Sequence, residues 1–412
     1  MPAFHLWKGS WGGGGGGGWE KGGKVKIGRA EQREIVQRRA QREWVDEHFR
    51  CAGFGRRCRH DGSSTRSTCR SHARRFTVLA LESSADDTCA AVVTSDRKIL
   101  SNVVVNQQAF LKEYGGIHPY VALHAHQRNM PGAVQRALRE ANLTVNDVDG
   151  IAFTLGPGLP GCLSICGNAA RTLAAVLSKP LVSVHHMQAH TLTPLLTSPP
   201  SEFPQFPFLT ILVSGGHTLL LLASSLTSFR ILATMLDESI GNAYDKVARL
   251  LNIPFDGRCA GAALERYCAS PLLAGEVVDG DVPEIKMPRP MPGRLAFSYT
   301  GLHSTIERFL HARGGTVDER TWLDLARSFQ HAAVGQLEAK LVLGIRQCAA
   351  QGVQVKSLVV SGGVANNAVM IGWAAMYRFM ASDTDEYSIE SCPVWSLEDL
   401  NKPGPPTDTE RM

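Results

Sequence analysis

The chain has 412 residues, a formal net charge of +5, 44% hydrophobic residues and 20% charged residues. These values are ordinary for a soluble globular protein with two domains or lobes. No uninterrupted apolar run approaches the ~20 residues that a membrane-spanning helix needs, so we expect no membrane contact. The ten cysteines include no Cys-x-x-Cys pair, and we expect reduced thiols.

Positive charge is concentrated near the N-terminus. Residues 1–75 hold 17 Lys and Arg against 7 Asp and Glu, which leaves residues 76–412 with a net charge of −5. Charge alone therefore does not indicate that the folded part binds nucleic acid, and any RNA contact would need a local basic patch. The glycine run at 12–18 and the Arg- and Ser-rich stretch at 56–75 favour a disordered transit region and a mitochondrial location. The alternative is a basic tail, or translated sequence outside the mature protein.

Two strand–turn–strand units suggest an internal duplication. The first has an acidic turn at residues 82–88, and the second has the glycine turn Ser214-Gly215-Gly216. Strands alternate with helices along the rest of the chain, which predicts α/β layers. Two such hairpins facing one cleft favour an actin-like (ASKHA) fold of two lobes. We expect strands at residues 77–81, 89–93, 150–154, 181–184, 209–213, 218–223, 230–235 and 357–361, and helices at 120–140, 162–177, 242–251 and 322–351, the last with a break.

A histidine pair and the glycine turn are the strongest chemical signals. His186 and His190 stand at i, i+4, so a helix would turn both imidazoles toward one metal ion. The Ser214-Gly215-Gly216 turn lies between two apolar runs, and its backbone N–H groups could cradle phosphate or carboxylate oxygens. Each signal alone is weak, because a histidine pair at this spacing is more often structural. Together they predict a metal ion beside an anionic ligand.

Seven short motifs occur in order between about residue 76 and residue 397. They are Glu82-Ser83-Ser84-Ala85-Asp86-Asp87-Thr88, Gly115-Gly116-Ile117, Gly156-Pro157-Gly158-Leu159, His186-x3-His190, Leu212-Val213-Ser214-Gly215-Gly216-His217, Asp245-Lys246-Val247-Ala248 and Ser361-Gly362-Gly363-Val364-Ala365. This set resembles the tRNA adenosine threonylcarbamoyltransferase family, specifically its mitochondrial, OSGEP-like type.

The resemblance implies a reaction and its participants. A threonylcarbamoyl group would pass from threonylcarbamoyl-adenylate to the exocyclic amine of the adenosine 3′ of the anticodon, in tRNAs that read codons starting with A. AMP would be the other product. The resemblance also implies the actin-like fold, a homodimer, a separate enzyme that makes the adenylate, and one divalent metal ion, iron or zinc. His186, His190 and one aspartate would bind that ion.

The resemblance also assigns residues to the ligand. Asp245 and Gly261 would contact the nucleoside of the adenylate. Asp245 suits the ribose because a carboxylate can accept hydrogen bonds from two hydroxyls. Glu265 would lie near the same ribose. Asn367, or its neighbour Asn366, would lie on the adenine side. The residues that would approach the phosphate or carbamate are Leu212, Val213, Ser214, Gly215 and Gly216.

Asp86 and Asp87 would lie across the cleft, where they would carry a proton or orient the acceptor amine. Structural alternatives stand beside several of these roles. Asp245 could be half of a surface charge pair, Gly156-Pro157-Gly158 could be only a tight turn, and His126 is more simply a structural histidine with satisfied hydrogen bonds.

The chain departs from the family pattern after Ala365. The family continues through a helix, a strand and a Pro-rich loop to the aspartate that is the third metal ligand, whereas here Ala365 runs directly into Asn366. A skipped exon or an error in the gene model explains the departure. Two neutral imidazoles would hold a divalent ion weakly, so we expect this chain to be destabilised and weakly active or inactive. A smaller departure is His303, where the family usually has Lys.

The expected organisation therefore has four parts. They are a leader at 1–75, a first lobe at 76–203, a second lobe at 204–356, and a shortened C-terminal segment at 357–412 that returns to the first lobe.

The sequence leaves three alternatives to the transferase. A metalloprotease of the zincin type needs Glu directly after the first histidine, and Met187 occupies that position. An ATP-dependent kinase or chaperone of the same fold also carries an acidic first hairpin but lacks the histidine pair. The third alternative is a non-catalytic splice form that lacks the third metal ligand and binds a partner or nothing.

Overall fold

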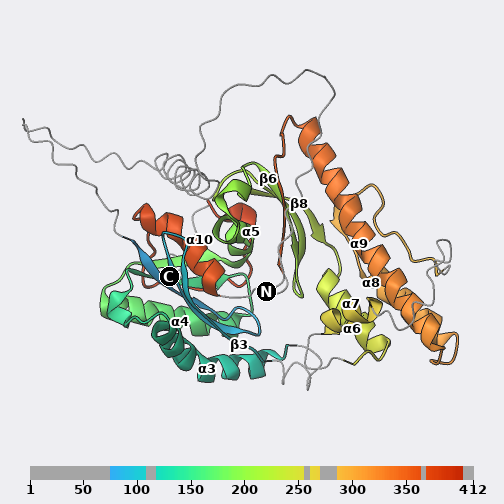
Figure 1. Ribbon diagram of the computed structural model, residues 1–412, viewed down its shortest axis with the longest axis horizontal. Helices are drawn as coiled ribbons and strands as arrows, with labels where there is room; N and C mark the ends of the chain where they lie inside the picture. The colour runs from blue at the N-terminus through green and yellow to red at the C-terminus, as the bar shows by residue number, and fades with distance from the viewer. Residues whose placement is uncertain (1–74, 108–116, 255–259, 270–284, 363–367, 402–412) are drawn as a thin grey trace, which may run out of the picture.

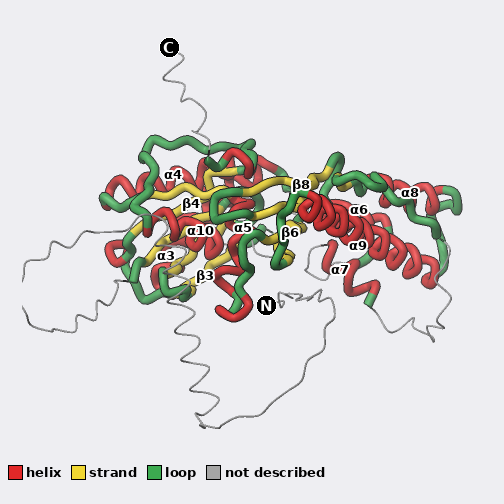
Figure 2. The backbone as a smooth tube through the Cα atoms, turned by 90° about the horizontal axis from the view of Figure 1, so that it is seen from above, coloured by secondary structure: helices red, strands yellow, loops and turns green. Residues whose placement is uncertain are grey.

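The computed structural model describes residues 75–107, 117–254, 260–269, 285–362 and 368–401 (Figure 1). The leader up to residue 74, Gly115, Gly116 and Asn367 lie outside the described residues. Two five-stranded sheets stand side by side with helices around them (Figure 2). No helix in the described ranges is long and apolar enough to cross a membrane.

The first sheet has the order β3-β2-β1-β4-β5. Strands β1, β2 and β3 are antiparallel neighbours, and β4 and β5 continue the sheet parallel to β1. Helices α3 and α4 cover one face. The bounds are β1 (Thr77–Glu82), β2 (Thr88–Thr94), β3 (Ile99–Val105), α3 (Pro119–Glu140), η1 (Val145–Asp147), β4 (Gly150–Gly156), α4 (Pro160–Leu177) and β5 (Leu181–His185).

The second sheet has the order β10-β6-β7-β8-β9. Strands β6, β7 and β8 are again antiparallel neighbours, and β10 pairs parallel to β6. The bounds are β6 (Phe208–Val213), β7 (Thr218–Ala223), β8 (Phe229–Met235), α6 (Ile240–Leu250), α7 (Ala260–Cys268), β9 (Ala296–Phe297), α8 (Thr300–His311), α9 (Glu319–Ala350) and β10 (Leu358–Ser361). The repeated order confirms the predicted α/β fold of two lobes with duplicated hairpins.

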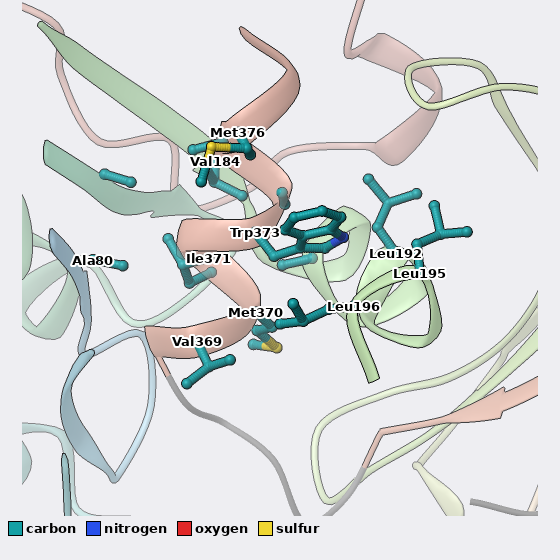
Figure 3. Close-up of a cluster of buried hydrophobic side chains, with 14 of the residues drawn as sticks. Ala80, Val184, Leu192, Leu195, Leu196, Val369, Met370, Ile371, Trp373 and Met376 are labelled. Carbon is teal, nitrogen blue, oxygen red and sulfur yellow. The ribbon is translucent and has the colours of Figure 1, made fainter. Parts of the chain in front are cut away.

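Two helices pack between the sheets and join them. Helix α5 (His186–Thr197) follows β5 directly, and α10 (Ala368–Met380) lies against β1 and β2. Trp373 and Ile371 of α10 point into a core that also holds Leu192 and Leu195 of α5 (Figure 3). The chain therefore returns to the first sheet at α10, after β10 has joined the second. Short 3-10 helices lie at η2 (Pro200–Glu202) and η4 (Leu397–Asp399).

The lobes differ after their fourth strand. The two sheets can be superposed strand by strand from their core packing. Leu79 and Leu81 of β1 face the outer helices of the first sheet, and Leu209 and Ile211 of β6 face those of the second. With the parallel registers, this places Val360 of β10 at the position that Phe153 holds in β4.

Phe153 is 1% exposed, lies against α4 at Gly167, and is followed by α4 and β5, whereas Val360 is 49% exposed. Only residues 362–367 separate β10 from α10, too few for a helix and a strand. The position at which the resemblance implies a missing segment therefore follows an edge strand with an exposed valine.

One element differs from its prediction. Helix α9 is continuous from Glu319 to Ala350, so the expected break is wrong. A Cβ at Gly344 would lie 2.6 Å from Leu220 Cδ2, so this glycine permits close packing on the sheet and does not interrupt the helix.

Candidate functional site

The histidine pair lies where β5 passes into α5. His185 ends the strand, and its Nδ1 accepts a hydrogen bond from the Met187 amide at 3.1 Å, which caps the helix. His186 and His190 are then one helical turn apart and 6% and 2% exposed. Their Nε2 atoms are 3.2 Å apart. Two nitrogen ligands of a tetrahedral ion would be about 3.3 Å apart, so the spacing fits two corners of one metal site.

Glu82 is the partner of His186, and the sequence analysis did not predict it. It ends β1, is 1% exposed, and its Oε2 lies 3.0 Å from His186 Nδ1. The Ser84 amide and the Thr154 hydroxyl also donate to this carboxylate. Burial opposes its ionisation, but His186 and these hydrogen bonds together lower the pKa of Glu82 to about 2. The sequence signal that could have identified Glu82 is a glutamate at the end of a largely apolar strand.

The acidic turn lies beside this carboxylate. Asp86 and Asp87 are partly buried, and burial raises the pKa of both. For Asp87 the charges of Asp86 and Glu82 add to burial and bring its pKa to about 7. His126 fixes the turn, because its Nδ1 lies 2.7 Å from the Thr88 hydroxyl and its Nε2 lies 3.0 Å from the Ala85 carbonyl oxygen. With both ring nitrogens engaged, His126 has the contacts of a structural histidine.

Hydrogen bonds between its first and last residues, Ser214 and His217, fix the glycine turn of the second hairpin. The Ser214 amide donates to the His217 carbonyl, and the His217 amide donates to the Ser214 hydroxyl, both at 2.9 Å. Gly215 and Gly216 are exposed, so their backbone can meet a ligand. Burial, and then the charge of His186, lower the pKa of His217. The turn is therefore within electrostatic range of the histidine pair.

Helix α6 begins against this turn. The Ser239 hydroxyl caps α6 by accepting from the Asn242 amide at 3.1 Å, and it donates to the Gly215 carbonyl at 2.5 Å. A Cβ at Gly241 would lie 2.6 Å from the Ser214 carbonyl oxygen. The N–H groups at the start of α6 and those of the turn thus lie together, which suits an anion.

A fourth glycine, Gly362, lies against the first strand of the same hairpin. Gly362 follows β10 with φ +109°, and a Cβ there would lie 2.4 Å from the Val213 carbonyl oxygen. Leu212, the residue before Val213, is 1% exposed. Leu212 therefore supports the hairpin from the core, whereas Val213 and the turn line its surface.

The proposed nucleoside residues are partly brought together. The Gly261 amide donates to Asp245 Oδ1 at 2.7 Å, which joins the start of α7 to α6. Burial raises the pKa of Asp245, although this hydrogen bond and Arg249 act in the opposite direction. Glu265 is exposed on α7, one turn after Gly261. Asn367 lies outside the described residues.

Two other predicted features have structural contacts. A Cβ at Gly158 would lie 2.7 Å from the Ser84 carbonyl oxygen, so Gly158 lets the loop approach the acidic turn closely. His303 Nδ1 lies 2.6 Å from Glu238 Oε1, and Lys246 Nζ lies 2.7 Å from Glu238 Oε2. Glu238 is 7% exposed, so His303 shares a buried carboxylate with a lysine.

Within the described part of the chain, no group of three or more His, Cys, Asp and Glu could hold a metal ion. His186 and His190 supply two nitrogen donors of the type that zinc and iron accept. Among the described residues, the histidine pair therefore offers two donors of a tetrahedral set.

The family model for tRNA N6-adenosine threonylcarbamoyltransferase matches residues 98–380. A tRNA N6-adenosine threonylcarbamoyltransferase from Sphingopyxis alaskensis is 36% identical over 352 residues, covering 78% of this chain and 95% of that one. This chain belongs to the tRNA N6-adenosine threonylcarbamoyltransferase family. Members of this family are transferases that modify tRNA. The two matches confirm the family predicted from the seven motifs.

Solved structures with a similar chain path have lower sequence identity to this chain. Component A of (R)-2-hydroxyglutaryl-CoA dehydratase from Acidaminococcus fermentans has a TM-score of 0.38 and 10% identity, covering 74% of this chain and 99% of that one. ROK hexokinase from Thermus thermophilus has a TM-score of 0.33 and 18% identity, covering 73% and 98%.

Proposed function

We propose that this chain transfers a threonylcarbamoyl group from threonylcarbamoyl-adenylate to the exocyclic amine of the adenosine 3′ of the anticodon, in tRNAs that read A-starting codons. It would act in the mitochondrion as an OSGEP-like homodimer, supplied by a separate adenylate-forming enzyme. One divalent ion, iron or zinc, would be its cofactor. The observation that carries this proposal is the 3.2 Å approach of His186 Nε2 and His190 Nε2.

The donor makes modest demands on the protein. It is a mixed carbamic–phosphoric anhydride, so AMP is a good leaving group and the protein need only position the reactants and stabilise charge. His186 and His190 would hold the metal ion, which supplies Lewis-acid polarisation of the carbamoyl group. Backbone N–H groups of Gly215, Gly216 and the start of α6 would bind the phosphate or carbamate oxygens.

Asp87 would accept the proton of the attacking amine. Its pKa of about 7 lets it exchange a proton near neutral pH. The acceptor nitrogen would form the new bond to the carbamoyl carbon as the bond to the AMP oxygen breaks. Its excess proton would pass to Asp87, while Asp86 orients the amine.

Asp245 and Gly261 would bind the nucleoside of the donor. The Asp245 carboxylate retains acceptor capacity beyond its hydrogen bond from Gly261, which suits ribose hydroxyls. Glu265, exposed on the next turn, would lie at the edge of the same ribose, and Asn367 would contact the adenine side.

A catalytically impaired form is the second candidate, and a specific observation favours it. Val360 is 49% exposed on the edge strand β10 of the second sheet. At the equivalent position of the first lobe, β4 is followed by another helix and strand, α4 and β5. An apolar surface left open in this way accords with loss of the segment that carries the third metal ligand.

The test is transfer of labelled threonine to tRNA. The purified chain would be incubated with tRNA, labelled threonine, bicarbonate, ATP and an adenylate-forming enzyme, with His190→Ala as the control. Label above that control would support the transferase. Label only after the missing segment is restored would support the impaired form. Absence of label from both, with phosphate release from ATP without tRNA, would favour a kinase or chaperone.

A further inference from the structure

Glu82 is a buried carboxylate with an unusual place in the fold. It ends β1, is 1% exposed, and faces α5 between the sheets. Its oxygens accept hydrogen bonds from the Ser84 amide and the Thr154 hydroxyl, and its Oε2 lies 3.0 Å from His186 Nδ1. An ionised carboxylate only accepts hydrogen bonds, so all three partners must be donors.

This requirement determines where the His186 ring holds its proton. Because Nδ1 donates to Glu82, a neutral imidazole leaves Nε2 with its lone pair free of hydrogen. That Nε2 is the atom 3.2 Å from His190 Nε2. The contact with Glu82 therefore turns the metal-binding Nε2 of His186 toward Nε2 of His190.

The second lobe shows that the sheet itself does not need a carboxylate here. The core-facing pattern and the registers of β1 and β6 place Leu212 at the position equivalent to Glu82. Leu212 is 1% exposed and packs in the apolar core between the sheets. A buried charge at one copy of a duplicated position, and an apolar side chain at the other, points to a role specific to the first lobe.

We propose that Glu82 is a positioning residue that fixes His186 as the Nδ1–H tautomer and presents its Nε2 to the metal ion. The proposal rests on the metal of the proposed function. A carboxylate behind a ligating histidine fixes the ring orientation and raises the basicity of the ligand, and its loss typically lowers metal affinity about 10–100-fold.

The test compares the full-length wild-type chain with Glu82→Gln and with Thr154→Val as a matched control. The control removes one donor to Glu82 and leaves the contact to His186. In each protein, nuclear magnetic resonance of ¹⁵N-labelled imidazoles without metal reports the His186 tautomer. Competition with a chromophoric chelator reports zinc affinity, and thermal unfolding reports whether each variant is folded.

We expect wild-type His186 to carry its proton on Nδ1. Glu82→Gln should populate the other tautomer and weaken zinc binding about 10–100-fold, whereas Thr154→Val should retain wild-type values within about threefold. Wild-type His186 with its proton on Nε2 would overturn the proposal without any variant. A folded Glu82→Gln protein with unchanged zinc affinity would also overturn it.

The two proposals fail in distinguishable ways. Zinc binding that depends on Glu82, without transfer to tRNA, would support the positioning role and contradict the proposed reaction. A wild-type chain that binds no zinc would contradict both the positioning role and the metal.

Discussion

The hydroxyl of Ser361 donates a hydrogen bond to the carbonyl oxygen of His190 at 2.9 Å. In a regular helix this carbonyl would accept from the amide four residues later, which here is Pro194 and has no N–H. The last residue of β10 thus replaces the hydrogen bond that a proline removes from α5. The second sheet thereby supports the helix that carries both histidines.

Substitution Ser361→Ala should destabilise the protein by about 1–3 kcal/mol, because the buried His190 carbonyl would lose its donor. Thermal or denaturant unfolding measures the change. Ser228→Ala, at an exposed serine, is the control and should change stability by less than about 0.5 kcal/mol. An equal effect of the two substitutions would show that the Ser361 contact has no special weight.

Substitution Gly241→Ala should weaken AMP binding. The new Cβ would lie 2.6 Å from the Ser214 carbonyl oxygen, so the start of α6 and the glycine turn must move apart. A shift of this size can cost about 100-fold where atoms must be placed accurately. Calorimetric titration with AMP tests the change.

The control is Gly335→Ala in α9, where nothing lies within 4 Å of a Cβ. It should leave AMP binding unchanged and stabilise the helix by about 0.5–1 kcal/mol. Wild-type AMP affinity in Gly241→Ala would contradict the placement of the phosphate.

Asp87 predicts a pH dependence of stability. Its folded-state pKa of about 7 lies above the ordinary value of 3.8, so between these values the folded state binds more protons than the unfolded state. Its contribution therefore becomes less favourable as pH rises through this window. Asp87→Asn should raise the melting temperature at pH 8 more than at pH 4, and should lower transfer to tRNA.

The matched control for Asp87 is Glu390→Gln, at an exposed carboxylate. It should leave the melting temperature nearly unchanged at both pH values. A stabilisation by Asp87→Asn that is the same at pH 4 and pH 8 would contradict the raised pKa.

The exposed apolar residues of α9 predict self-association. Val334, Val342 and Ile345 are 41%, 46% and 45% exposed and lie on one side of the helix. Paired substitutions Val342→Thr and Ile345→Lys should reduce light scattering at high protein concentration without lowering stability. Val176→Lys, at an isolated exposed valine of α4, should leave the scattering unchanged. Scattering that falls equally in both proteins would indicate a general effect of charge.

Local pattern was enough to predict much of the fold. The two hairpins, α3, α4, α6 and the strands around them follow from apolar runs separated by polar or glycine turns. Strand β3 was missed because its polar and apolar residues do not alternate as its burial does: Ser101 is buried, whereas Ile99 and Val104 are exposed. Pairing of β9 with β8, and of β10 with β6, depends on contacts far apart in the chain, which no local pattern encodes.

The site was predictable where a motif names the residue and unpredictable where packing decides. The i, i+4 spacing of His186 and His190 was enough to predict that both side chains lie on one face of a helix. Glu82 was missed because a polar residue at a strand end is usually solvated, and its burial depends on α5 and β4. The Ser361 contact was likewise hidden, since it joins residues 171 positions apart.

The most direct measurement is metal retention by the purified full-length chain, compared with His190→Ala. With only His186 and His190 as protein ligands in the described part of the chain, zinc should bind weakly and be removed by brief dialysis against a chelator. His190→Ala should then bind no zinc. One zinc ion per chain that survives the dialysis would show a complete ligand set and contradict the account of an impaired site.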